Sequence, residues 1–86
     1  MSKITEVLER NGATNIEGYV LVNNYGYCFN LPSGNRYDAR FWANCYGAYI
    51  GRWDTMRASD KNSTPTEEET KLLEKITDEL NEIGEE

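Results

Sequence analysis

Histidine is absent from this chain of 86 residues. Its absence removes the commonest general base, proton shuttle and metal ligand of proteins. Nucleophilic triads that depend on histidine are therefore excluded, and no group of cysteines has the spacing of a metal site. No glycine-rich loop that would bind phosphate opens a helix. We predict a protein that is not an enzyme and holds no metal or cofactor.

Long apolar runs are also lacking. Residues 1–6 do not form the apolar core of a signal peptide, and no segment approaches the ~20 apolar residues of a membrane span. We therefore expect a soluble protein in the cytoplasm, without a membrane partner. In that compartment the two cysteines, Cys28 and Cys45, are expected as buried thiols rather than as a disulfide.

Aromatic residues are missing from both ends of the chain. All ten lie between Tyr19 and Trp53, so the core must form around this block and the aliphatic flanks must pack onto it. The length suits a single domain with one thin core. We divide it into a helix with its connector (1–17), an aromatic β unit (18–57), a linker (58–64) and an acidic helix (65–84).

Basic residues are scarce near the C-terminus. The net charge of −6 divides into −1 for residues 1–17, +2 for residues 18–61 and −7 for residues 62–86. An evenly acidic surface would indicate solubility only, whereas this separation allows a specific electrostatic face.

Helical patterns occur at both ends of the chain. Ser2 is a suitable N-cap for a helix over residues 3–11, and Gly12 can take the left-handed conformation that ends it. Near the other end, Thr64 and Glu67 flank Pro65 in the pattern of a capping box, which predicts a second helix. An apolar stripe follows the second helix as far as Gly84: Leu72, Leu73, Ile76, Leu80 and Ile83.

The aromatic block has a β pattern. Residues 19–22 and 27–31 are expected to pair as a hairpin around a turn at residues 23–26, and residues 13–18 are expected to be a connector. Arg36–Asn44 alternates as a third strand, although a short helix capped by Asp38 and ending at Gly47 stays open. A fourth strand is expected over residues 48–55.

These elements predict an α+β fold, in which a short N-terminal helix and a longer acidic C-terminal helix cover one face of a four-stranded antiparallel meander. The alternation of the third strand places Arg36, Arg40 and Trp42 together on one face, away from Tyr37 and Phe41. Arginine and aromatic side chains are typical both of protein interfaces and of surfaces that bind single-stranded nucleic acid.

The second candidate site lies on the acidic helix. Carboxylates beside the helix N-terminus are explained by the macrodipole, but Glu74, Asp78 and Glu82 continue toward the C-terminus, where the dipole disfavours them. They form either a solvated face or an anionic strip that binds a basic partner. Asp38 and Asp54 are expected in turn or surface positions.

Two functions follow from these surfaces. The first is a small non-catalytic protein-binding module, an inhibitor that occupies the basic surface of a partner such as a nucleic-acid-binding enzyme. In size and charge alone it resembles phage-encoded inhibitors of the anti-CRISPR and anti-restriction classes, which would place it in the host cytoplasm. The alternative is a module that binds single-stranded nucleic acid through the aromatic and arginine face, a less favoured partner because the acidic helix repels phosphate.

Overall fold

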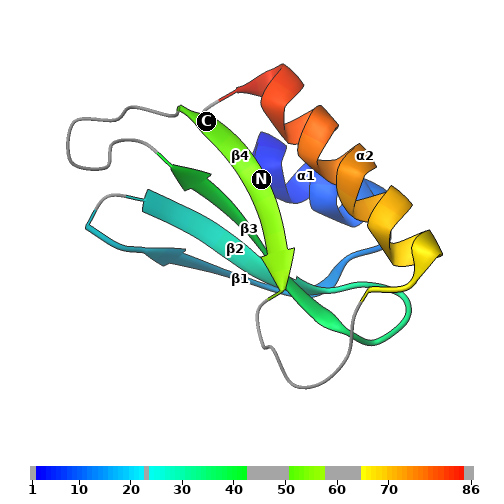
Figure 1. Ribbon diagram of the computed structural model, residues 1–86. Coiled ribbons are helices and arrows are strands. Elements are labelled where there is room, and N and C mark those ends of the chain that lie inside the picture. The colour runs from blue at the N-terminus through cyan, green and yellow to red at the C-terminus, as the bar shows by residue number, and fades with distance from the viewer. Residues whose placement is uncertain (1, 23, 43–50, 58–64, 85–86) are drawn as a thin grey trace.

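The computed structural model describes residues 2–22, 24–42, 51–57 and 65–84. The predicted linker 58–64 and the residues Cys45 and Thr64 lie outside this part of the chain. The elements in chain order are α1 (Lys3–Arg10), β1 (Thr14–Val20), β2 (Asn24–Asn30), β3 (Arg36–Trp42), β4 (Arg52–Arg57) and α2 (Glu67–Ile83) (Figure 1).

The four strands form one antiparallel sheet in the order β1-β2-β3-β4, so each strand pairs with its neighbour in the chain. Both helices lie on the same side of this sheet, α2 against β4 and α1 beside α2 (Figure 1). The predicted α+β fold is thereby confirmed. The opposite face of the sheet is covered by neither helix.

The first strand begins earlier than predicted. Residues 14–18 belong to β1, and Asn24, Tyr25 and Gly26 belong to β2 rather than to a turn. The sequence pattern did not predict the first half of β1, because most side chains of this strand are exposed and a register shift between Thr14 and Glu17 interrupts the alternation. Asn15 takes a φ of 51° within that irregular segment.

The third element is a strand, so the helical alternative for residues 38–47 is wrong where the structure describes it. Tyr37, Ala39 and Phe41 point into the core, and Arg36, Arg40 and Trp42 lie on the other face. Pairing with β2 on one side and β4 on the other outweighs the local capping propensity of Asp38. The last strand runs from Arg52 to Arg57, two residues past its predicted end at residue 55, and its predicted start at residues 48–50 lies outside the described residues.

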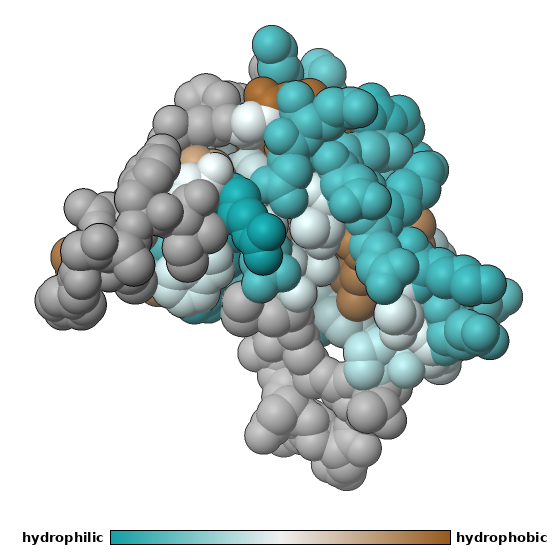
Figure 2. Space-filling model, turned by 45° about the horizontal axis from the view of Figure 1, so that its top comes forward, coloured by the Kyte–Doolittle hydropathy of each residue, from teal (hydrophilic) through white to brown (hydrophobic). Residues whose placement is uncertain are grey.

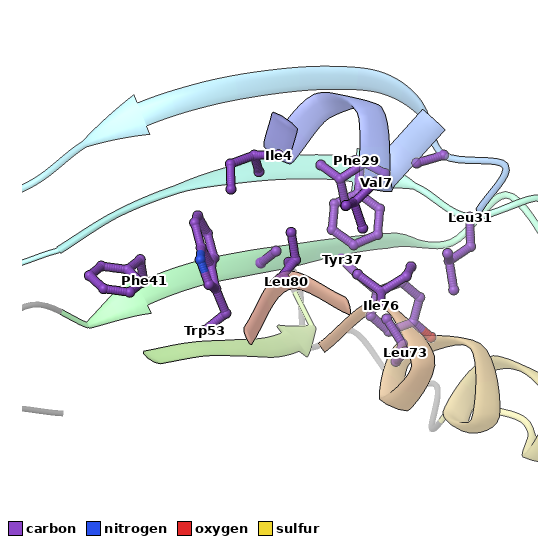
Figure 3. Close-up of a cluster of buried hydrophobic side chains, with 13 residues drawn as sticks. Ile4, Val7, Phe29, Leu31, Tyr37, Phe41, Trp53, Leu73, Ile76 and Leu80 are labelled. Atoms are coloured by element: carbon purple, nitrogen blue, oxygen red, sulfur yellow. The ribbon is translucent and has the colours of Figure 1, made fainter. Parts of the chain in front are cut away.

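The core lies between the helices and the sheet (Figure 3). Trp53 is 1% exposed and packs against the rings of Tyr25, Tyr27 and Phe41, with centroid distances of 5.6, 6.4 and 5.3 Å respectively. The aliphatic side chains that cover this aromatic layer come from both helices: Ile4, Val7 and Leu8 from α1, and Leu73, Ile76 and Leu80 from α2. The expected division between an aromatic sheet and aliphatic flanks is confirmed.

Two acidic residues of α2 hold the fold together. Glu79 accepts hydrogen bonds from Asn11 (3.0 Å) and Arg10 (3.1 Å), which ties α2 to the end of α1. The Asn11 hydrogen bond, followed by Arg10, lowers the pKa of Glu79. Glu69, only 4% exposed, accepts from Ser33 and from Asn35 (2.8 Å) in the β2–β3 turn.

Glu69 also closes the start of α2. The cap predicted at Thr64 is wrong, because the helix begins at Glu67 with Thr66 as its N-cap. The Thr66 hydroxyl accepts from the Glu69 N–H (3.1 Å), and the Glu69 carboxylate accepts from the Thr66 N–H (3.0 Å). The capping box therefore lies two residues after the predicted one. Thr66 is the N-cap because its partner Glu69, three residues later, also reaches the β2–β3 turn.

Replacing Thr66 with alanine is expected to lower the free energy of unfolding by ~1 kcal/mol, because one backbone N–H of the first turn loses its acceptor. Urea denaturation followed by circular dichroism would measure this change. Thr70→Ala, at an exposed position inside the same helix, is the control and should not destabilise the protein. Equal midpoints for wild type and Thr66→Ala would contradict the cap.

Candidate functional site

The outward side of α2 is strongly acidic. The helix carries seven acidic and two basic residues. Glu69 and Glu79 are used inside the fold, whereas Glu74, Asp78 and Glu82 are exposed. None of these last three forms an ion pair with another described residue. The predicted anionic strip is therefore at the surface, with its charge not neutralised by the described part of the chain.

A groove of about 430 Å³ runs between α2 and β4 and adds depth to this strip. Glu74, Asp78 and the apolar Leu73 line it from α2, and Asp54 and Thr55 line it from β4. Glu82, one turn beyond Asp78, is not among the lining residues. In Figure 2 hydrophilic atoms cover most of the surface on the side of α2, with narrow strips of hydrophobic atoms between them.

Asp54 is the residue of this groove that sequence reasoning missed. It is exposed on β4 and pairs with Arg40, so its side chain lies on the sheet face opposite to α2, and alternation alone gives no sign that the residue borders the groove. Its position follows from two contacts that dock α2 onto β4. The hydroxyls of Thr55 and Thr77 are 2.8 Å apart, and Asn81 bonds the backbone of Trp53. No local signal in the sequence predicts these contacts.

The second predicted set, Arg36, Arg40 and Trp42, does share one face of β3, but this face is opposite to the helices. The structure therefore does not bring it together with the acidic strip. Arg36 donates to Glu17 (2.7 Å) and to Asn30 (2.7 Å), so its charge is already paired.

Arg40 is paired as well. It donates to Asp38 (2.9 Å) and to the hydroxyl of Tyr19 (2.8 Å), and it lies over the rings of Tyr19 and Trp42. Asp38, expected in a turn or at the surface, is 4% exposed and accepts from the Tyr19 hydroxyl at 2.7 and 2.8 Å. Burial and the bond to Asp38 raise the pKa of Tyr19 to about 12.

In this arrangement the two arginines of the predicted face bind other side chains of the same protein. Tyr19 reaches from β1 to β3 across Gly26 of β2, where any side chain would collide with its hydroxyl. A phosphate would have to compete with Glu17 and Asp38 for the two guanidinium groups. The geometry of the described residues thus disfavours a nucleic-acid backbone on this face.

Cys28 lies on the same uncovered face, paired with Asp38 of β3. It is half-buried rather than buried, because Tyr25, Tyr27 and Phe29 occupy the core side of β2. Burial, followed by the negative charge of Asp38, raises the pKa of the thiol. A raised pKa disfavours the thiolate, which argues against a nucleophilic role.

Among the described residues, no group of three or more acidic or cysteine side chains is arranged to hold a metal ion. Neither α1 nor α2 is both long enough and apolar enough to cross a membrane. Comparisons with protein-family models, with curated proteins and with solved structures found no match for this chain.

Proposed function

We propose that this protein is a non-catalytic binding module that recognises a basic surface of a partner protein through α2 and the adjoining groove. The observation that carries the proposal is that Glu74 and Asp78 line one groove and that neither forms an ion pair with a described residue. Exposed carboxylates that repel one another do not stabilise the fold. Binding of a basic partner explains why they lie together.

The distribution of acidic residues supports this proposal. Glu69 and Glu79 each accept several hydrogen bonds inside the fold, so their presence is explained by stability. The remaining strip of Glu74, Asp78 and Glu82 has no such role among the described residues. Inhibition of a nucleic-acid-binding enzyme, by occupying its basic surface, is the narrower form of the proposal, and a cytoplasmic location belongs to it.

Affinity purification of the tagged protein, followed by mass spectrometry, is the first experiment. We expect one stoichiometric protein with a basic surface, recovered equally with and without nuclease. Recovery that depends on nucleic acid would instead support the alternative module on the open sheet face.

Charge reversal then tests the surface itself. Glu74→Lys with Asp78→Lys changes the local charge by +4, and we expect affinity for the recovered partner to fall roughly 10- to 100-fold, mainly through slower association. Adding Glu82→Lys should increase the loss. The wild-type complex should also weaken as salt rises, since the Debye length is only about 10 Å at 0.1 M.

The matched control reverses two exposed acids on the other helix, Glu6→Lys with Glu9→Lys, which changes the charge by the same +4. This variant should bind nearly as well as wild type. If both pairs weaken binding equally, net charge rather than the acidic groove explains the interaction. A folded Glu74/Asp78 variant with unchanged affinity would overturn the proposed function.

A further inference from the structure

The outer strand β4 has one edge that pairs with β3 and another that faces α2. Asn81 of α2 covers one position of this second edge. Its side-chain oxygen accepts from the Trp53 N–H (2.7 Å), and its side-chain nitrogen donates to the Trp53 carbonyl (3.1 Å). The amide group thus makes the two hydrogen bonds that a neighbouring strand would make.

The same edge continues past Asn81. Successive residues of a strand direct their N–H and C=O groups to opposite edges, so Thr55, two residues after Trp53, turns its backbone the same way. The hairpin bond from the Leu21 N–H to the Asn24 carbonyl (2.7 Å) shows that Asn24 directs its backbone groups toward β1. When this alternation is followed through the pairs of β2 with β3 and of β3 with β4, the backbone groups of Trp53 and Thr55 again point away from β3. No hydrogen bond joins the Thr55 backbone to a described residue outside the sheet.

Thr55, with its open strand edge, lies in the wall of the acidic groove. The groove is lined by Asp54 and Thr55 on one side and by Glu74, Thr77 and Asp78 on the other. An open strand edge recognises an extended chain through main-chain hydrogen bonds, whatever its sequence. The carboxylates of Glu74 and Asp78 then select a segment whose side chains are basic.

We propose that the partner contributes an extended segment rich in lysine or arginine, which adds to the sheet as a fifth strand beside Thr55. This inference rests on the proposed function and specifies how the acidic groove is used. The backbone of the segment pairs with Thr55, while its basic side chains on the side of α2 reach Glu74 and Asp78. Asn81 stops the added strand at Trp53 and so sets its register.

The other outer strand, β1, also offers an edge to a partner, but it lacks the unpaired negative charge found beside β4. β1 ends at a hairpin tip with exposed apolar side chains, Val20 being 82% and Val22 97% exposed. Its one acidic residue, Glu17, is paired with Arg36 (2.7 Å), and no residue of β1 lines either of the two grooves that border α2. A basic segment is therefore expected at β4.

Proline substitution at Thr55 tests the pairing. Proline removes the outward N–H without removing a hydrogen bond to β3, and it is tolerated at the free side of an edge strand. It also removes the hydroxyl that contacts Thr77, so Thr55→Val, which keeps the N–H, is the control. The probe is a capped hexapeptide of alternating lysine and threonine, titrated into the isotope-labelled full chain and followed by NMR amide shifts.

We expect the largest shifts at Thr55 and at the α2 residues that line the groove. Affinity should fall at least about tenfold in Thr55→Pro, the cost of one lost main-chain hydrogen bond, and should stay within about twofold in Thr55→Val. Two further peptides, N-methylated at alternate residues in opposite phases, make the test independent of folding of the variant. One phase should abolish binding to the wild-type chain, and the other should be tolerated.

The outcomes separate this inference from the proposed function. If Glu74→Lys with Asp78→Lys weakens peptide binding but Thr55→Pro and both methylated peptides bind normally, the acidic surface stands and strand addition is overturned. Shifts confined to β1, or no binding of the hexapeptide at millimolar concentration, would also overturn strand addition. Normal peptide binding by the charge-reversed protein would contradict the acidic groove itself.

Discussion

Replacing Glu69 with glutamine is expected to lower the free energy of unfolding by about 2–4 kcal/mol, a large share of the stability of a small domain. The carboxylate accepts hydrogen bonds from Ser33, from Asn35 (2.8 Å), from Tyr37 (3.1 Å) and from the Thr66 N–H (3.0 Å). It joins the β2–β3 turn, the core face of β3 and the first turn of α2.

Glutamine keeps the shape of Glu69 but replaces one acceptor oxygen with an NH₂ group that faces donors. At least one buried donor therefore loses its partner, and the remaining bonds lose their charge assistance. Glu68→Gln, at the exposed neighbouring position, is the matched control and should change stability by less than about 0.5 kcal/mol. Urea denaturation would measure both variants, and equal midpoints for Glu69→Gln and wild type would show that the carboxylate does not bind the turn.

The same carboxylate predicts how stability depends on pH. Hydrogen bonds from Ser33 and the Thr66 backbone, which outweigh burial, lower the pKa of Glu69 from 4.5 to about 2. A lowered pKa in the folded state means that the stabilisation is fully present above the unfolded value and is lost as pH falls from about 4.5 toward 2. Glu69→Gln should therefore show a smaller loss of stability over that interval than wild type.

Gly26→Ala is expected to destabilise the protein by about 2–3 kcal/mol, because there is no room for a side chain at this position of β2. A Cβ atom would lie 2.4 Å from the carbonyl oxygen of Ala39 and 2.8 Å from the hydroxyl of Tyr19. Relief of the first contact requires a shift of the β3 backbone, and relief of the second breaks the bonds from Tyr19 to Asp38.

Gly18→Ala is the matched control, since it is also a strand glycine. Its Cβ would approach only the ring edge of Tyr27, at 3.1 Å, from the outer strand β1. A cost below about 1 kcal/mol is expected there, because β1 is an outer strand whose backbone can shift by a few tenths of an ångström away from Tyr27. Thermal unfolding of both variants would decide the matter, and a Gly26→Ala protein as stable as Gly18→Ala would contradict the network across β2.

Local patterns in the sequence were sufficient for much of the fold. The alternation of Tyr37, Ala39 and Phe41 predicted the core side of β3, and the apolar stripe Leu73–Ile76–Leu80 predicted the buried face of α2. Each pattern reflects one element burying one face, so it can be read within a single segment. The Ser2 cap and the end of α2 at Gly84 are local for the same reason.

The predictions that were wrong concern elements that bury little or depend on distant residues. β1 has mostly exposed side chains and an irregular register, so its first half shows no alternation. Thr64 and Thr66 both fit the local sequence pattern of an N-cap. The helix begins after Thr66 because its partner Glu69 also binds Ser33 and Asn35. A tertiary contact thus decided a local boundary.

The sequence alone determined that Glu74, Asp78 and Glu82 share one exposed side of an acidic helix and that Arg36, Arg40 and Trp42 share one side of a strand, because both statements depend only on residue spacing. Only the tertiary structure decided what each set faces. Docking of α2 on β4 places an open strand edge beside Glu74 and Asp78, whereas pairing of β1 with β2 brings Glu17 and Tyr19 onto the arginine face. Charges become available or neutralised through contacts between elements, and no spacing within one element encodes those contacts.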